Sequence, residues 1–139
     1  MRTSLYHVQL NVGDAARTIP FYKDLFGYLE YRVLMEAPDF VGASNGTTDF
    51  WLVATPDERR TTPFHRKNTG LNHPAFGVRA REDVNRFAAE FLRPRGIPAL
   101  YESPRDYPEY HAGYYAVFFE DPDRLKLEVA HVPGLTDRG

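Results

Sequence analysis

The sequence predicts an α+β fold built from two copies of one unit. Alternating apolar and polar residues indicate strands, and residues 15–26 and 81–92 have the periodicity of amphipathic helices. Shifting the chain by 66 residues aligns the strand around His7 with the strand around His73. Each half then contains a strand, a helix and three further strands. Neither half closes a core comfortably by itself, so one shared domain is expected over residues 1–139.

The two modules have clear boundaries in the pattern. The first covers about residues 4–55, the second covers about 71–131, and a linker rich in proline, threonine and charge joins them at 56–70. A loop is expected at 103–112, because it contains two prolines and several polar residues. The strands are expected at residues 4–12, 28–35, 39–44, 49–55, 71–79, 98–102, 113–120 and 124–131.

The composition narrows the class of protein. The chain has 139 residues, of which 42% are apolar and 26% charged, and its formal charge of −2 gives no footprint for nucleic acid or an anionic membrane. No apolar run approaches the ~20 residues of a membrane span. The first residues lack the apolar core of a signal peptide, so a cytoplasmic location is expected. There is no cysteine, which excludes disulfides and thiolate chemistry.

Three residues suggest a metal site. Glu128 lies in the middle of the last predicted strand, where a carboxylate is costly unless it is paired or binds a cation. His7 and His73 occupy matching positions in the repeat. Two imidazoles and one carboxylate form a ligand set for a divalent metal with open positions, so His7, His73 and Glu128 are predicted to bind Fe, Mn, Ni or Zn. The alternative is that Glu128 pairs with a histidine or Lys126 and no metal binds.

Three stretches carry a resemblance to a known family. They are YHVQLNVGDAARTIPFYKDLFG at 6–27, GLNHPAFGV at 70–78 and FFEDPDRLKLEV at 118–129. Together they resemble the vicinal oxygen chelate (VOC) superfamily, which includes glyoxalase I, methylmalonyl-CoA epimerase, fosfomycin- and bleomycin-resistance proteins and extradiol dioxygenases. The resemblance implies an eight-stranded, U-shaped mixed sheet around a metal. It also implies that His7, His73 and Glu128 occupy three of the family's ligand positions.

The sequence departs from the family pattern at several positions. The resemblance places the fourth glyoxalase-type ligand at Leu52, as the counterpart of Glu128 on the corresponding strand of the first half. Leucine can neither bind a metal nor remove a proton. The remaining triad is more similar to the open sites of fosfomycin-resistance transferases and extradiol dioxygenases. However, Gln9 stands where those transferases have threonine, and residues 105–111 replace their potassium loop. Most dioxygenases of the family also have four modules, whereas this chain has two.

Aromatic and polar residues are predicted around the metal. Strand alternation and the resemblance together place a set of side chains on the concave face: Gln9, Phe50, Leu52, Tyr114 and Phe118. The loop at 103–112 is predicted to cover the site, with Tyr110 or His111 contacting the substrate and Glu128 as a further candidate base. The alternative is that this loop packs against the partner subunit of a homodimer.

The sequence therefore favours a small metal-dependent enzyme of the lyase, dioxygenase or transferase type. Its metal would bind two oxygens of a small-molecule substrate and stabilise negative charge on one of them. The many aromatic residues support a second hypothesis, a metal-free protein that sequesters a drug, similar to bleomycin-resistance proteins. The exposed edges expected of each four-stranded half favour a homodimer.

Overall fold

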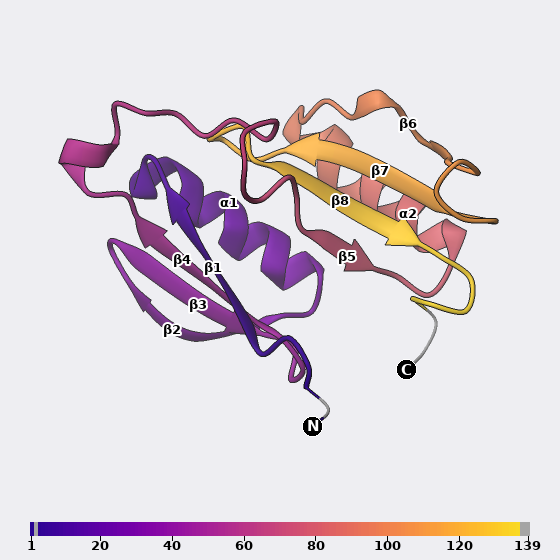
Figure 1. The fold of residues 1–139 in the computed structure, drawn as a ribbon, viewed down its shortest axis with the longest axis horizontal. Helices are drawn as coiled ribbons and strands as arrows, with labels where there is room; N and C mark the ends of the chain where they lie inside the picture. Colours follow the sequence, from indigo (N-terminus) through magenta and orange to yellow (C-terminus); the bar gives the residue numbers. More distant parts are fainter. Residues whose placement is uncertain (2, 137–139) are drawn as a thin grey trace. The chain divides into compact units, whose positions relative to one another are not determined.

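The computed structural model describes residue 1 and residues 3–136, which divide into two compact units, the first ending at Phe64 and the second starting at His65. Each unit contains a four-stranded mixed sheet with one principal helix, in the order strand, helix, strand, strand, strand (Figure 1). The α+β class and the repeat predicted from the sequence are therefore confirmed. No helix in the described part of the chain is both long and apolar enough to span a membrane.

The outermost strands of the first sheet are β1 and β2, which are the first two strands along the chain. The sheet order is β1-β4-β3-β2, with β1 parallel to β4 and the other neighbours antiparallel. The helix starts after Asp14, whose side chain accepts a hydrogen bond from the backbone N–H of Ala16 and caps it. The elements are β1 (His7–Val12), α1 (Ala15–Tyr28), β2 (Arg32–Ala37), β3 (Phe40–Ser44) and β4 (Asp49–Ala54).

One face of the first sheet forms the core under α1. Leu10 on β1 pairs with Leu52 on β4, and both are buried. Phe50 lies on the same face as Leu52, and its ring centroid is 5.7 Å from that of Phe26 on α1. The prediction that Phe50 and Leu52 line an open face is therefore wrong, because alternation turns them towards the helix. His7 and Gln9 alternate with these residues and are exposed.

The second unit repeats this topology with a shorter first strand. Its sheet order is β5-β8-β7-β6, and β5 is parallel to β8. Gly96, at φ 64°, ends the helical segment, as its position in the sequence predicts. The elements are β5 (Ala75–Gly77), α2 (Arg81–Phe87), a π-helical turn (Ala88–Leu92), a 3₁₀ turn (Arg93–Arg95), β6 (Leu100–Asp106), β7 (Tyr115–Glu120) and β8 (Lys126–His131).

The second sheet also buries one face against its helix. Phe87 of α2 lies 5.2 Å from Phe119 of β7 between ring centroids, and Val129 of β8 is fully buried. Phe118 and Glu128 are paired across β7 and β8 and alternate with these core residues, so they lie on the opposite face. This opposite face carries the site described below.

The registers also correct which residue of the first unit matches Glu128. Glu128 pairs with Ala75, and the repeat equates Ala75 with Gln9, which is 66 residues earlier. Gln9 pairs with Trp51, not with Leu52. The position matching Glu128 is therefore Trp51, because a shift of one residue moves a side chain to the other face of a sheet.

Two boundaries differ from the sequence prediction in ways that bear on the site. His73 precedes β5 rather than lying within it, because Pro74 has no N–H to donate to a strand partner. β6 continues to Asp106, so the loop between β6 and β7 runs over residues 107–114 rather than 103–112. Residues 103–106 therefore belong to strand β6, although the prolines in this part of the sequence suggested a loop.

Candidate functional site

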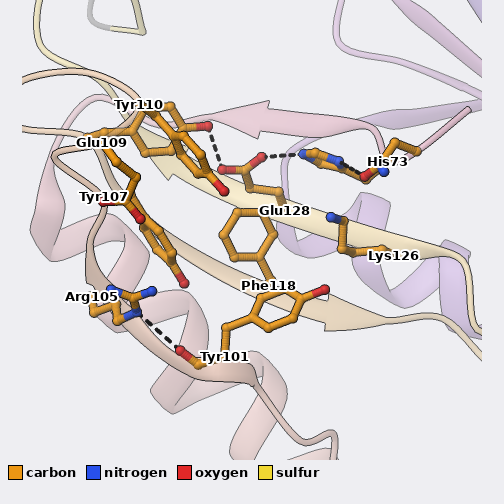
Figure 2. A pocket seen from close by; sticks show the side chains of 11 residues that line it. His73, Tyr101, Arg105, Tyr107, Glu109, Tyr110, Phe118, Lys126 and Glu128 are labelled. Carbon is orange, nitrogen blue, oxygen red and sulfur yellow. Dashed lines mark hydrogen bonds and ion pairs between the residues drawn. The ribbon is translucent and has the colours of Figure 1, made fainter. Parts of the chain in front are cut away.

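The open face of the second sheet contains a cavity of about 630 Å³. Its base is formed by β7 and β8, and β6 and the loop that follows it provide one wall (Figure 2). Most of the lining is aromatic, with a few charged groups among the rings. The lining residues are Asn72, His73, Tyr101, Arg105, Tyr107, Glu109, Tyr110, Tyr114, Phe118, Lys126 and Glu128.

Glu128 is the buried charged group of this cavity, with 1% of its surface exposed. Its Oε2 lies 2.8 Å from Nε2 of His73, and its Oε1 accepts a hydrogen bond of 2.6 Å from the Tyr114 hydroxyl. Both oxygens are therefore held, which offsets the cost of burying a carboxylate. Burial first, and then the hydrogen bond and charge of Glu128, raise the pKa of Tyr114 well above its usual value. Tyr114 accordingly remains a donor to Glu128 across the physiological range.

Asn72 determines which ring nitrogen of His73 carries the hydrogen. The Nδ2 amide of Asn72 donates to the backbone carbonyl of Arg66 at 3.1 Å, so its Oδ1 is the atom that faces Nδ1 of His73, at 2.7 Å. An amide oxygen only accepts, and Nδ1 must therefore donate. In the neutral imidazole, the lone pair is then on Nε2, which faces Glu128. A lone pair and a carboxylate oxygen 2.8 Å apart repel each other unless a proton lies between them or a metal ion beside them binds both.

Lys126 lies on the same face of β8 as Glu128, two residues away. Its Nζ is 5.4 Å from the ring centroid of Phe118 and 5.7 Å from that of Tyr101, both within cation–π range. Burial lowers the pKa of Lys126, as does the nearby charge of Arg66, while Glu128 opposes this shift. The cavity therefore contains a partly desolvated cation beside its buried carboxylate.

The wall of the cavity is shaped by an irregular part of β6. Between the pairs Leu100–Phe118 and Arg105–Ala116, β6 has four residues where β7 has one. Tyr101 and Glu102 in this bulge have φ of 59° and 56°, a left-handed conformation that is unfavourable for non-glycine residues. The hydroxyl of Ser103 accepts from the backbone N–H of Phe118, which replaces a lost ladder contact. The bulge turns Tyr101 towards the cavity.

The loop after β6 contributes three tyrosines whose rings pack against one another. Tyr110 lies parallel to Tyr107, with ring centroids 5.6 Å apart, and meets Tyr114 edge-on at 5.5 Å. Tyr110 is exposed and lies at the rim of the cavity. His111 is also exposed but is not among the cavity-lining residues, and its Nδ1 faces the carbonyl of Ala112. The structure therefore favours Tyr110 over His111 as a residue that contacts a ligand.

The structure brings some of the sequence-predicted residues together and separates others. His73, Tyr110, Tyr114, Phe118 and Glu128 line one cavity. His7 and Gln9 lie on the exposed face of β1 in the first unit, and their roles stay predictions. Within the described part of the second unit, no third histidine or carboxylate joins the pair of His73 and Glu128.

Six residues that line the cavity were not among the site residues predicted from the sequence. Lys126 has a signal in the sequence, because it alternates in phase with Glu128 on β8. Asn72 is adjacent to a candidate ligand, yet nothing in its type indicates that it orients the imidazole. Tyr101 and Arg105 are placed by the bulge in β6, which has no local sequence signal. The six residues are Asn72, Tyr101, Arg105, Tyr107, Glu109 and Lys126.

Comparison with known proteins agrees with this topology. The family model of the Glyoxalase/Bleomycin resistance protein/Dioxygenase superfamily matches residues 4–129, which is nearly the whole chain. The chain belongs to this superfamily. This membership confirms the resemblance drawn from the three sequence motifs. The superfamily is named for glyoxalases, bleomycin-resistance proteins and dioxygenases.

Relatives of this superfamily member include both named and unnamed activities. The uncharacterised protein YqjT of Bacillus subtilis is 32% identical over 90% of this chain and 96% of its own length. The metallothiol transferase FosB of Staphylococcus saprophyticus is 27% identical over 99% of this chain and 82% of its own. A solved structure of a candidate glyoxalase from Bacillus halodurans has a TM-score of 0.83 and 38% identity, covering 92% of this chain and 95% of its own.

A more distant structure supports the fold alone. The lactoylglutathione lyase of Agrobacterium tumefaciens has a TM-score of 0.69 and 21% identity, over 94% of this chain and 95% of its own. The topology of this superfamily member is thus shared by proteins with different reactions. Its reaction must be inferred from the site.

Proposed function

We propose that this protein is a metal-dependent enzyme that binds a divalent ion through Nε2 of His73 and the carboxylate of Glu128. His7 is the third ligand in this proposal, supplied by the same chain or by a partner copy. The observation that carries it is the hydrogen-bond chain from Asn72 through His73 to Glu128, which leaves the Nε2 lone pair facing a carboxylate oxygen. An imidazole nitrogen and a carboxylate oxygen suit Fe, Mn, Ni or Zn.

Group transfer is the reaction type that the observations support best among lyase, dioxygenase and transferase. The relative FosB, 27% identical over nearly the whole chain, is a metallothiol transferase. The position matching Glu128 in the first unit is Trp51, which cannot bind a metal or accept a proton. A metal with three protein ligands keeps positions open for two substrate oxygens, whereas a fourth protein ligand would fill one of them.

Each group of the cavity has a role in this proposal. When bound, the metal supplies Lewis-acid stabilisation of negative charge on a substrate oxygen. Tyr114 holds Oε1 of Glu128 and so leaves Oε2 directed towards His73. Lys126 provides positive charge beside the same carboxylate, and Tyr110 covers the rim and excludes water from the substrate.

A metal-free binding protein remains the second candidate, supported by the aromatic lining of a cavity of about 630 Å³. This volume lies within the range of small-molecule sites, and five of the lining residues are tyrosine or phenylalanine. In this case the His73–Glu128 contact would be a proton-bridged pair that fixes the shape of the cavity.

Metal titration distinguishes the two candidates. Calorimetry with Zn(II) and Mn(II) on chelator-treated protein is expected to show one site per chain in the wild type. His73→Ala and Glu128→Gln should each weaken binding by at least ~100-fold because they remove a ligand. His65→Ala is the matched control, since His65 is exposed and outside the cavity. Equal, weak binding by all four proteins would rule out the metal site. Tight binding that survives His7→Ala would remove only the third ligand from the proposal.

Assembly as a two-fold dimer is part of the same proposal. The edge strand β2 exposes Val33, Leu34 and Met35, with 43%, 54% and 57% of their surfaces accessible. Exposed apolar edge strands are usually covered by a partner or a neighbouring segment. Sedimentation equilibrium is expected to give twice the 16.0 kDa chain mass, and Met35→Lys should shift it towards the monomer. A monomeric wild type at micromolar concentration would rule out this assembly.

A further inference from the structure

The rim of the cavity contains an arginine that is held in place without a carboxylate partner. The Nε of Arg105 donates to the carbonyl of Tyr101 at 3.2 Å, and its Nη1 donates to the carbonyl of Asp106 at 3.3 Å. Its guanidinium also stacks 4.2 Å above the ring of Tyr107. Among the residues that the structure describes, no carboxylate forms an ion pair with it; Asp106 pairs with Arg81. The Nη2 edge of a fixed guanidinium is therefore available to a ligand.

The hydroxyl of Tyr107 lies beside this arginine. Tyr107 has 2% of its surface exposed, lines the cavity, and has a buried hydroxyl with no aligned hydrogen-bond partner in the described residues. Burial raises the pKa of Tyr107, while the charge of Arg105 and weak side-chain hydrogen bonds with Ser103 and Arg105 oppose this shift. Figure 2 shows this hydroxyl next to the Arg105 guanidinium. A buried hydroxyl without an aligned partner costs stability, so a ligand oxygen that accepted from it would be bound favourably.

The surface between this pair and Glu128 is formed by two aromatic rings. Phe118 and Tyr101 meet edge-on with ring centroids 5.6 Å apart, and Figure 2 shows them between Arg105 on one side and Lys126 on the other. Tyr101 owes its position to the left-handed backbone of the β6 bulge. Strained backbone that presents a side chain to a cavity is common at binding sites. A ligand lying on these rings would have one end at Arg105 and Tyr107.

We propose that Arg105 and Tyr107 form an oxyanion subsite, and that the ligand is an organic acid with an apolar body. The guanidinium fork binds two oxygens of a carboxylate or phosphonate, Tyr107 donates to one of them, and the body lies on Phe118 and Tyr101. Glu109 also lines the cavity, but it is exposed and solvent screens its charge. This inference extends the proposed function by naming the substrate class, and it needs no metal.

Calorimetry on chelator-treated protein tests the subsite independently of the metal. The probes are phenylacetate, benzylphosphonate and the uncharged 2-phenylethanol. Wild type is expected to bind at least one of the anions about tenfold or more tightly than the alcohol. The tighter of the two anions identifies the acid. Equal affinities for anions and alcohol, or no binding of any probe up to about 10 mM, would overturn the proposal whatever the outcome of the metal titration.

Variants then locate the subsite. Arg105→Gln is expected to remove the preference for the anion, Arg105→Lys to restore part of it because charge remains without the fork, and Tyr107→Phe to weaken the anion and leave the alcohol unchanged. Arg95→Gln is the matched control, because Arg95 stacks 4.1 Å from the Phe91 ring centroid and lies outside the cavity. Melting temperature is measured for each variant. An anion preference that survives both Arg105→Gln and Tyr107→Phe would refute the assignment.

Discussion

The inner strands of the two sheets differ at one matching position. In the first unit, β4 places Trp51 there, opposite Gly42 of β3. In the second unit, β8 places Glu128 there, opposite Phe118 of β7. The large side chain has thus moved from the inner strand to its neighbour, and the inner strand has gained a carboxylate. Because of this exchange, the same βαβββ unit has a buried carboxylate at this position in the second sheet and an apolar indole ring at it in the first.

The glycine in the first unit is explained by this exchange. A Cβ built at position 42 would collide with the ring of Trp51, so the indole lies directly over the glycine. In the second unit the corresponding ring belongs to Phe118, which packs edge-on against His73 at 5.7 Å between ring centroids. An aromatic ring therefore occupies this cross-strand pair in each sheet, from β4 in the first unit and from β7 in the second, and only the second arrangement leaves the inner strand position to a carboxylate.

The edge strands differ as well. β2 has one extra residue, Leu34, between its pairs Val33–Ala43 and Met35–Gly42. β6 has a four-residue bulge opposite one residue of β7, which directs Tyr101 towards the cavity. A small bulge keeps a strand close to its neighbour, whereas a larger one opens the sheet edge and re-aims side chains. The cavity of the second unit follows from its bulge as much as from Glu128.

The largest expected effect concerns the residues that precede the two histidines. Asn72 hydrogen-bonds to His73, whereas its counterpart Tyr6 contacts His7 only through its ring, at 5.1 Å and 82°. Asn72→Ala frees the imidazole to rotate or change tautomer, and metal affinity is expected to fall by about 10–100-fold. Tyr6→Phe keeps the ring and should leave the affinity unchanged. Competition titration measures both.

Asn72→Ala also has a readout that does not depend on metal. The ¹⁵N shifts of His73 in metal-free protein should report the Nδ1–H tautomer in the wild type and a mixture in the variant, with Asn72→Asp restoring the Nδ1–H form. An unchanged tautomer in Asn72→Ala would show that Asn72 does not orient the ring.

A somewhat smaller effect is expected from the glycine under Trp51. Gly42→Ala forces the indole away from the sheet, and the free energy of unfolding should fall by about 1–3 kcal/mol. Gly27→Ala is the control, since a Cβ at this helical position meets no atom within 4 Å and should stabilise by about 0.5–1 kcal/mol. Urea denaturation of both variants measures the difference. If Gly42→Ala were as stable as the wild type, the Trp51 side chain would have repacked without a loss of stability.

Much of the fold could be predicted because its signals are local. Helical periodicity, strand alternation and the 66-residue repeat together indicate two βαβββ units. The same alternation places Lys126 and Glu128 on one face of β8, opposite the buried Val129. The proximity of His73 to Glu128 could also be predicted, because the repeat marks His73 as a site residue and a mid-strand carboxylate requires a partner.

The remainder depends on pairings between distant strands. The assignment of Leu52 as the counterpart of Glu128 was off by one residue, because an insertion in the second half hides the register that equates Trp51 with it. The bulge in β6 is defined only against β7, so the placement of Tyr101 and Arg105 has no local signal. The prolines at 104 and 108 suggested a loop, yet β6 tolerates the first of them at the bulge.

The smallest expected effect concerns the ion pair that ties each helix to its edge strand. In the first unit Lys23 of α1 pairs with Glu36 of β2 at 2.5 Å. In the second, Arg81 of α2 donates from Nη1 and Nη2 to the two carboxylate oxygens of Asp106 of β6, and its guanidinium stacks 4.0 Å from the ring centroid of Tyr115. Both pairs are exposed, so each contributes little. Asp106→Asn is still expected to lower the melting temperature more than Glu36→Gln, because Arg81 is held in a bidentate, stacked geometry.

The pH dependence makes this last difference specific. The hydrogen bond from Arg81 lowers the pKa of Asp106 in the folded protein, whereas the unfolded chain has the ordinary value. The folded state therefore binds the proton less readily, and the stabilisation is present above the unfolded pKa and lost as pH falls through the folded one. The melting difference between wild type and Asp106→Asn should shrink as pH falls from 6 towards 2 and should also shrink in 1 M salt. A melting-temperature difference that stays constant with pH would assign the effect to packing on Tyr115 rather than to charge. The Arg81–Asp106 and Lys23–Glu36 pairs would then differ only in the aromatic ring that Arg81 contacts.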